Sequence, residues 1–329
     1  MSGEHKVLTV VIPSYNVEKY LPEIIPYYLN ESILEDIELL IVNDGSKDRT
    51  EEIALQYQGI YPDTIRVINK PNGGHGSTIN RGLQEATGKY FKVIDGDDWV
   101  DTDGLVRLIH YLKLTDVDLV MNPFVRVNVD DGSHQLKETD VLIPGQVYIL
   151  DEIISKLINF YQLHSNTYKT SILKQMKRID ENCFYVDQEY VIYPLGNVNN
   201  VVYLDFPVYQ YRVGNVDQSM SLKNMQKNRK MHEKVIMSLL DFLNTTNHSD
   251  NIQSFIKYKI QKMCQLQIDT FFSMKKTKET ISETMTFLEN VKQKNSEVYC
   301  NIPGKKVSFL RAFGRMGYHV VYLVKGFDR

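Results

Sequence analysis

Short apolar runs alternate with helix-type patterns along the first 120 residues. Runs of β-branched and aliphatic residues predict buried strands at residues 7–12, 37–42, 64–69, 90–94 and 118–121. Between them, apolar positions at helical spacing predict helices at residues 18–29, 48–58, 77–87 and 103–113. This alternation predicts βαβ units, and hence a Rossmann-like α/β fold with a mostly parallel central sheet flanked by helices.

Three polar clusters follow three of the predicted strands, at residues 14–16 (Ser-Tyr-Asn), 43–46 (Asn-Asp-Gly-Ser) and 95–98 (Asp-Gly-Asp-Asp). In a parallel sheet the carboxyl ends of the strands share one edge, and ligands bind in the crevice outside that edge. The clusters come from separate stretches of sequence, and we expect them to meet there. Their convergence predicts a binding site.

The cluster at residues 95–98 places three carboxylates within four residues. Like charges this close raise one another's pKa unless a cation neutralises them. Mg²⁺ and Mn²⁺ prefer oxygen ligands, and Mg²⁺ is often held by carboxylates together with substrate phosphates. One interpretation is therefore a divalent ion that bridges the protein and a diphosphate. The other is an acidic turn that caps a helix, because Asp101 and Asp103 continue the run.

Other nucleotide-binding and metal-binding motifs do not fit. An EF-hand loop needs an oxygen ligand at its fifth position, where Trp99 stands if the count begins at Asp95. A Walker loop needs four residues between its glycines, whereas five separate Gly82 from Gly88. The glycine-rich dinucleotide fingerprint does not follow the first predicted strand. Kinase and dehydrogenase functions are therefore disfavoured.

The composition is that of an ordinary globular protein of 329 residues, 43% of them apolar and 24% charged. The near balance of 38 Lys+Arg against 41 Asp+Glu argues against a dedicated nucleic-acid binder. Cys183, Cys264 and Cys300 are too few and too far apart for a disulfide framework or a metal knuckle. No apolar stretch approaches the ~18 residues of a membrane span. We therefore expect a cytoplasmic protein, or one that is peripheral at the inner face of the cell membrane.

The last third of the chain differs in pattern and charge. Helical spacing predicts helices at residues 225–244, 252–275 and 279–292, without a catalytic constellation. Residues 251–329 hold 14 Lys+Arg against 6 Asp+Glu, a net charge of +8, whereas the remaining 250 residues hold 24 against 35, a net charge of −11. The tail at residues 304–329 interleaves basic and apolar residues. This pattern predicts either a membrane-surface helix attracted to anionic lipid or a final helix docked on the body.

Four stretches within the first 101 residues closely resemble glycosyltransferase family 2, which has the GT-A fold. They are VVIPSYN (residues 10–16), LLIVNDGSKDRT (39–50), NKPNGGHGSTINRGLQEATGKY (69–90) and VIDGDDWVD (93–101). A looser resemblance continues through YVDQEYVIYP (185–194) and VYQYRVGNVDQSMS (208–221). It implies a GT-A catalytic domain at residues 1–221, with a donor half at about 1–120 and an acceptor half at about 121–221, then a helical module at 222–303 and the tail at 304–329.

The resemblance implies that the first two clusters hold the nucleotide of a UDP-sugar. Pro13, Tyr15 and Asn16 would line the base pocket, and Asp44 would accept a hydrogen bond from the uracil imide N–H. Simple packing of Tyr15 and a turn-forming Asp44 are the alternatives. Further contacts to the donor phosphates or sugar are implied for Lys70, Gly73, Gly74, Arg81, Trp99 and Arg212.

The segment at residues 95–98 resembles the family's DxD signature, which binds Mn²⁺ or Mg²⁺. By that resemblance Asp95 and Asp97 contact the donor, Asp97 through its ribose, and Asp98 binds the metal together with Asp97. The assignment among the three stays open by one position. The metal would stabilise charge on the departing nucleoside diphosphate. Arg212 and Ser219 lie in a stretch that resembles the family's flexible loop, which closes over the diphosphate.

An inverting transferase needs a base that takes the proton of the acceptor hydroxyl. The family usually carries a Glu-Asp pair for this task, and here Val186 replaces the Glu. Asp187 is the predicted base and Glu189 the reserve, while a helix-capping Asp187 is the alternative. His164 and Tyr168 fall where family members build the acceptor side.

The resemblance therefore implies an inverting, metal-dependent glycosyltransferase. It would move a hexosyl or N-acetylhexosaminyl group from a UDP-sugar to a hydroxyl of a bacterial surface glycan or exopolysaccharide, lipid-linked acceptors included. No nucleic-acid partner is expected, and a homo-oligomer stays open. The main alternative is a non-catalytic nucleotide-sugar-binding protein, because of Val186. A glycoside hydrolase, which needs two flanking carboxylates and no nucleotide, and a nucleotidyltransferase are the others.

Overall fold

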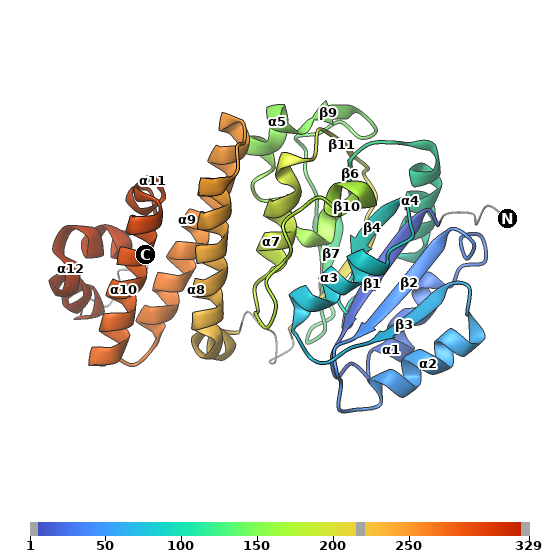
Figure 1. Cartoon of the computed structure of the whole chain (residues 1–329), viewed down its shortest axis with the longest axis horizontal. Coiled ribbons are helices and arrows are strands. Elements are labelled where there is room, and N and C mark those ends of the chain that lie inside the picture. The colour runs from blue at the N-terminus through green and yellow to red at the C-terminus, as the bar shows by residue number, and fades with distance from the viewer. Residues whose placement is uncertain (1–5, 215–220, 324–329) are drawn as a thin grey trace. The chain divides into compact units, whose positions relative to one another are not determined.

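The structure is a computed structural model that describes residues 6–214 and 221–323. The chain divides into two compact units, Met1–Asn215 and Val216–Arg329 (Figure 1). Within the described residues every strand belongs to the first unit, and the second unit is built of helices. This arrangement confirms the predicted α/β fold with a C-terminal helical region.

The central sheet of the first unit is mixed. The strands that the sequence predicts pair mostly in parallel. Within residues 6–214 it contains eight strands, in the spatial order β3 (Ile65–Asn69), β2 (Ile37–Asn43), β1 (Leu8–Ser14), β4 (Tyr90–Val93), β10 (Asn166–Lys169), β6 (Leu119–Met121), β11 (Asn200–Tyr203) and β9 (Val147–Ile149). The pairs of β1 with β2, β2 with β3, β1 with β4 and β6 with β11 are parallel. The five strands predicted from apolar runs are all present.

Burial explains why these runs form strands. Every residue of β1 and β2 is buried, as expected for parallel strands covered on both faces by helices. The short and long helices of this unit are α1 (Leu21–Ile24), α2 (Thr50–Ile60), α3 (His75–Glu85), α4 (Thr102–Leu114), α5 (Leu150–Ile153), α6 (Thr170–Leu173) and α7 (Asp187–Ile192). Single 3₁₀ turns are η1 (Ile25–Tyr28), η2 (Ile154–Leu157), η3 (Leu163–Ser165) and η4 (Tyr193–Gly196).

Two parts of the fold differ from the prediction. The helix expected at residues 18–29 is only the short α1 followed by η1, because Pro22 and Pro26 lack the N–H donors that a continuous helix needs. In addition, β10 runs antiparallel between β4 and β6. Its residues alternate little in polarity, and their pairing depends on strands that lie far away in the sequence.

A second sheet, which the apolar pattern does not predict, supports the acidic turn. Within the described residues it has four strands, in the order β5 (Trp99–Val100), β12 (Tyr209–Val213), β7 (Phe124–Asn128) and β8 (His134–Lys137). Tyr209 is the cross-strand partner of Val100, and Gln210 is the partner of Trp99. This pairing brings residues 209–213 beside residues 95–98.

The strand order fixes where a ligand can bind. The chain runs outward from β1 to β2 and β3, and then returns to place β4 on the other side of β1. The direction therefore reverses between β1 and β4, which is the topological switch point of such a sheet. We call the residues that directly follow β1, β2, β3 and β4 the carboxyl edge.

The second unit consists of α8 (Leu222–Thr245), α9 (Asp250–Ser273), α10 (Lys278–Lys294), α11 (Ser296–Cys300) and α12 (Lys305–Leu323). The three predicted long helices are confirmed. Ser221, Ser249 and Thr277 cap their N-termini, each accepting a hydrogen bond from a main-chain N–H three residues on. Helix α12 is kinked at Gly314, which has a φ of 53°. Among the described residues no helix has the length and apolarity to cross a membrane.

Candidate active site

The carboxyl edge brings the three polar clusters together, as the sequence predicts. The N–H of Asn16 donates to the Ser46 hydroxyl (3.0 Å), and the Asn16 side chain accepts from the Lys47 N–H (2.8 Å). On the other side of β1, the Gly96 N–H donates to the Pro13 carbonyl (3.2 Å). The clusters after β1, β2 and β4 therefore form one continuous surface.

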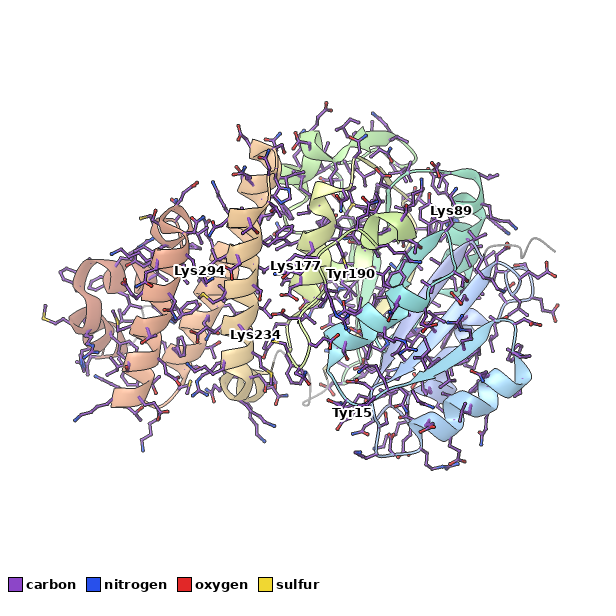
Figure 2. All side chains as sticks on the ribbon, viewed as in Figure 1. Tyr15, Lys89, Lys177, Tyr190, Lys234 and Lys294 are labelled. Carbon is purple, nitrogen blue, oxygen red and sulfur yellow. The ribbon has the colours of Figure 1, made fainter. Side chains whose placement is uncertain are left out.

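Tyr15 is an exposed aromatic residue at this edge. Its side chain is 50% exposed (Figure 2), whereas Pro13 is buried within β1. Asn16 follows in the left-handed region, with a φ of 55°, where asparagine is among the residues that fit best. The turn thus holds a flat ring in the open, where it can stack on a nucleobase.

The carboxylate of Asp44 organises the loop that follows β3. It is 2% exposed. Its Oδ1 accepts from the Lys70 ammonium (2.5 Å) and from the Gly73 N–H (2.9 Å), and its Oδ2 accepts from the Gly74 N–H (2.8 Å). The Lys70 ammonium also donates to the Ser77 hydroxyl (2.8 Å). Lys70, Gly73 and Gly74 therefore all bond to Asp44, and Oδ2 keeps room for one more donor.

Asp98, which the sequence predicts as a metal ligand, has partners within the protein for both of its carboxylate oxygens. Its side chain is turned inward, and the residue is 1% exposed. Oδ2 accepts from the Tyr209 hydroxyl (2.6 Å), and Oδ1 accepts from the Arg212 N–H (2.7 Å). Burial, followed by the charges of Asp97 and Asp95, raises its pKa well above the usual value. Asp98 therefore links the acidic turn to β12.

Asp95 and Asp97 face the other way. Both are half-buried. The carboxylate of Asp97 makes no hydrogen bond to another described residue, and its pKa is raised by burial and by the charge of Asp95. A carboxylate in this state fits a divalent cation shared with substrate phosphates. No group of three His, Cys, Asp or Glu side chains in the described part of the chain forms a metal site by itself, so the phosphates would have to complete the coordination.

Arg212 and Trp99 fix the acidic turn. The Arg212 guanidinium lies over the rings of Trp99 and Tyr20, at 4.8 and 5.1 Å from their centroids. Its Nε donates to the Asp97 carbonyl (2.7 Å), and its Nη2 pairs with Glu23 (2.8 Å). Arg212 therefore lies over Trp99 and holds the turn. Ser219, expected in the same closing loop, lies outside the described residues.

His75 is a member of the site that the sequence analysis missed. It is the first residue of α3, and its Nε2 lies 2.7 Å from Asp95 Oδ1. Burial opposes the charged imidazole, but Asp95, with smaller contributions from Asp187 and Asp97, raises the pKa of His75 above its usual value. The same contact lowers the pKa of Asp95 against the effect of burial. In the sequence His75 stands within a glycine-rich turn, two residues before the predicted helix at 77–87, and no motif marks it.

The predicted base Asp187 reaches the site through a segment docked on α3. The Asn80 side chain accepts from the Ile179 N–H (3.1 Å) and donates to the Ile179 carbonyl (2.8 Å). A Cβ on Gly76 would lie 2.2 Å from the Asp180 carbonyl oxygen, so the approach requires glycine. Asp187 opens α7, is half-buried and accepts from the Gln188 amide (2.8 Å).

Glu189 does not fit the role of reserve base. It is 0% exposed. Its carboxylate accepts from the Asp180 N–H (2.7 Å) and from the Tyr193 hydroxyl (2.8 Å), and burial raises its pKa to about 7. Oε2 thus holds the 179–183 segment, and Oε1 links α7 to the Tyr193 hydroxyl.

The residues expected on the acceptor side lie largely in the core. Tyr168 is 0% exposed, and its hydroxyl bonds to Tyr161 (3.1 Å) and Asn166 (2.9 Å). Tyr168 is therefore a core residue whose hydroxyl is satisfied within the protein. The His164 ring lies 4.4 Å from that of Tyr211, and burial lowers the pKa of His164 to about 4. His164 is thus a neutral member of an aromatic stack.

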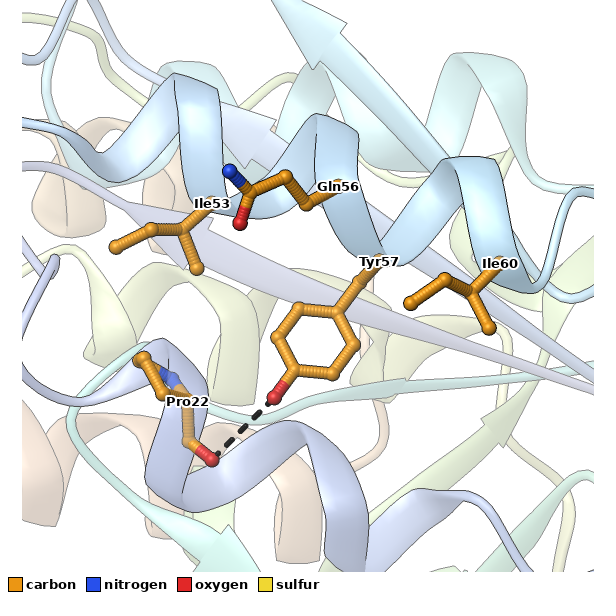
Figure 3. A pocket seen from close by; sticks show the side chains of 5 residues that line it. All are labelled: Pro22, Ile53, Gln56, Tyr57 and Ile60. Carbon is orange, nitrogen blue, oxygen red and sulfur yellow. Dashed lines mark hydrogen bonds between the residues drawn. The ribbon is translucent and has the colours of Figure 1, made fainter.

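Two further features of this unit are the Arg81 ion pair on α3 and a hollow away from the carboxyl edge. Arg81 pairs with Glu85 one turn along α3 (2.8 Å) and is largely exposed. A hollow of about 320 Å³ lies between α1 and α2 (Figure 3), where the Tyr57 hydroxyl reaches the Pro22 carbonyl (3.5 Å). Its lining is Pro22, Ile53, Gln56, Tyr57 and Ile60. It contains no charged side chain and no residue of the carboxyl edge, so we assign it no part in the chemistry.

Comparison with known proteins agrees with this geometry. The sequence model of the family "Glycosyl transferase family 2" matches residues 9–181, more than half of the chain. The minor teichoic acid biosynthesis protein GgaB of Bacillus subtilis is 31% identical over 261 residues, which cover 77% of this chain and 28% of GgaB. The chain spans less than two thirds of the length of the first curated relatives that it matches.

Two solved structures share the fold. A crystal structure of S. aureus TarS 1–349 in complex with UDP-GlcNAc has a TM-score of 0.68 at 17% identity, covering 96% of this chain and 90% of TarS 1–349. The mannosyltransferase PcManGT of Pyrobaculum calidifontis, in complex with GDP-Man and Mn²⁺, has a TM-score of 0.54 at 12% identity, covering 99% and 83%. At these identities the likeness shows the fold, and it confirms the GT-A class.

The state of Glu189 predicts a pH dependence of stability. Because folding raises its pKa from 4.5 to about 7, the native state binds more protons than the unfolded state within that window, and stability falls as the pH rises through it. Glu189→Gln keeps a neutral group that can bond to the Asp180 N–H and the Tyr193 hydroxyl. We expect the free energy of unfolding of the variant, relative to that of the wild type, to increase by up to about 3 kcal/mol as the pH rises from 5 to 8. Urea unfolding across this range measures the difference, and parallel curves for the two proteins would contradict it.

Proposed function

The chain belongs to glycosyltransferase family 2, and from this premise we propose that it transfers a sugar from a UDP-sugar to a hydroxyl of a cell-surface glycan, with inversion at the anomeric carbon. The observation that carries the proposal is the meeting of the polar clusters with Tyr15, Asp44 and Asp97 at one sheet edge beside the switch point, with Asp187 near enough for its charge to act on His75. The relative GgaB, a teichoic acid biosynthesis protein, supports the glycan class. The TarS complex with UDP-GlcNAc supports the donor class.

The nucleotide half of the donor has two partners on this edge. The exposed ring of Tyr15 stacks on the uracil, a contact for which a flat and half-exposed aromatic side chain is suited. Asp44 Oδ2 accepts one hydrogen bond within the protein, and its remaining lone pair accepts the uracil imide N–H. The diphosphate then lies over the acidic turn.

Asp187 acts as the base. Its carboxylate takes the proton of the acceptor hydroxyl while the hydroxyl oxygen attacks the anomeric carbon. The bond from that carbon to the β-phosphate oxygen breaks, and UDP leaves with the electron pair. Attack on the face opposite the leaving group inverts the anomeric configuration. Val186, which stands where the family has Glu, is 0% exposed, so the departure from the family motif places an apolar residue in the core and leaves Asp187 in place.

Asp97 is the residue that would hold a divalent metal. Its carboxylate has no other partner among the described residues, and PcManGT, which shares the fold, is complexed with Mn²⁺. A bound Mn²⁺ or Mg²⁺ would neutralise charge on the departing diphosphate. The chain itself keeps Asp97 in the open by turning Asp98 inward to Tyr209.

Helix α12 supports a contact with a membrane surface. Its exposed apolar residues include Phe313 (54% exposed), just before the kink at Gly314, and Met316 (71%), Val320 (43%) and Leu323 (76%), which follow one another at helical spacing beyond the kink. Arg315 and His319 are exposed on the same stretch. An apolar face beside cations suits the surface of an anionic bilayer, where a lipid-linked acceptor would be found.

Asp187→Asn tests the transferase. The donor is first chosen as the nucleotide sugar that most raises the melting temperature in the presence of Mn²⁺. We expect sugar transfer by the variant to fall about 10³-fold, because the amide cannot take a proton, while donor binding by calorimetry stays within about twofold. Glu189→Gln is the matched control and should keep its activity at neutral pH. An active Asp187→Asn would overturn the assignment, and binding without transfer in the wild type would favour the non-catalytic alternative.

Asp97→Asn and Asp98→Asn form a matched pair for the metal. In the wild type, Mn²⁺ should raise the affinity for UDP. In Asp97→Asn we expect the Mn²⁺-dependent increase in UDP affinity to be at least about tenfold smaller, because the variant lacks the available carboxylate. Asp98→Asn should keep the full increase and should have a lower melting temperature. Calorimetric titration of UDP with and without Mn²⁺ measures both. A full Mn²⁺ effect in Asp97→Asn would count against this site.

Vesicle flotation tests the membrane contact. We expect the chain to float with vesicles that contain anionic lipid and to stay behind with neutral ones. Phe313→Glu combined with Met316→Glu should abolish flotation, because both place charge among the exposed apolar residues of α12. Leu114→Glu on α4, where Leu114 is 90% exposed, is the control and should float as the wild type does. Equal flotation of all variants would overturn the proposal.

A further inference from the structure

The cations predicted for the donor phosphates are already paired within the protein. The Lys70 ammonium bonds to Asp44, to the Pro71 carbonyl (2.6 Å) and to Ser77. The Arg212 guanidinium bonds to Glu23 and to the Asp97 carbonyl. Arg81 is paired with Glu85. The Lys70 ammonium, whose three donors are all used, would have to give up a partner before it could contact a phosphate.

The groups that line the acidic turn are mainly anionic. Asp95 and Asp97 are two residues apart, and Asp187 acts on the same surroundings through its charge on His75. A nucleoside diphosphate is itself an anion and gains negative charge as it leaves. A site for it therefore needs positive charge close to these carboxylates, beyond a single metal ion.

His75 lies among these carboxylates. Its Nε2 is held at 2.7 Å by Asp95 Oδ1, and the side chain is 28% exposed. The second ring nitrogen, Nδ1, makes no hydrogen bond to a described residue. The ring is therefore anchored at one nitrogen and open at the other, and the attraction of Asp95 and Asp187 favours its charged form.

The position of the ring is fixed from both sides. On one side Gly74, with a φ of 80°, bonds through its N–H to Asp44. On the other side Gly76 packs against the Asp180 carbonyl, where a Cβ would be only 2.2 Å away. The residue between the two glycines has little freedom to move, which is the condition for a preorganised electrostatic contact.

We propose that His75 is a diphosphate-binding residue of the donor site: Asp95 orients the imidazole through Nε2, and the Nδ1–H donates to the β-phosphate of the donor. As the bond to the anomeric carbon breaks, this hydrogen bond strengthens with the charge on the leaving oxygen. The inference rests on the proposed function, since it needs a nucleoside diphosphate over the acidic turn. It assigns the positive charge there to a residue that composition and motif spacing do not reveal.

The test compares UDP with uridine on the full chain, by calorimetry in the presence of Mn²⁺. His75→Gln keeps an N–H at the position of Nε2 and lacks the second nitrogen and the charge. We expect its affinity for UDP to fall at least about tenfold, while its affinity for uridine stays within about twofold. Its kcat should fall about 10²-fold, with little change in the KM of the acceptor. His110→Gln, at an exposed position of α4, is the control and should match the wild type.

A second variant separates binding from support of the loop. His75→Asn places its amide N–H near the position of Nδ1 and loses the contact with Asp95, so it should recover part of the UDP affinity that His75→Gln loses. Equal losses of UDP and uridine in both variants would mean a purely structural role and would overturn the inference, as would unchanged UDP binding. If the wild type itself binds no UDP, it is the proposed function that fails.

Discussion

The buried carboxylate of Asp44 is the interaction on which the rest of the site depends. A charge that is 2% exposed needs partners, and here the Lys70 ammonium and the N–H groups of Gly73 and Gly74 supply them. These bonds fix the course of the loop between β3 and α3. The direction of α3, and with it the place of His75, follows from satisfying one carboxylate at the end of β2.

The same loop then positions the segment that precedes Asp187. The Asn182 N–H donates to the Gly73 carbonyl (2.5 Å), and Glu189 holds the Asp180 N–H from the interior. Asn182 and Tyr185 adopt left-handed φ values of 54° and 69°, a conformation that is costly for a bulky tyrosine. Strain of this kind persists where surrounding contacts over-determine the backbone, and it lies two residues before Asp187.

Most charged side chains near the acidic turn have a partner within the protein. Arg212 is held against the acidic turn by Glu23, Trp99 and Tyr20, while Asp98 is withdrawn to Tyr209. Without that withdrawal three carboxylates would face one another across a single turn. The arrangement leaves Asp97 half-buried and without a hydrogen bond to another described residue.

The sequence by itself determined the strands and the edge at which they end. Runs of buried aliphatic residues form β1, β2 and β4, and because parallel neighbours end at one edge, the clusters after them had to meet. Only the tertiary structure decided which way each side chain in those clusters points. Asp98 turns to Tyr209, 111 residues away. Lys92 lies fully buried in β4, bonded to the carbonyls of His164 and Asn166. The physical reason is that periodicity records local burial, whereas the direction of a polar side chain depends on partners that only the folded chain brings within reach.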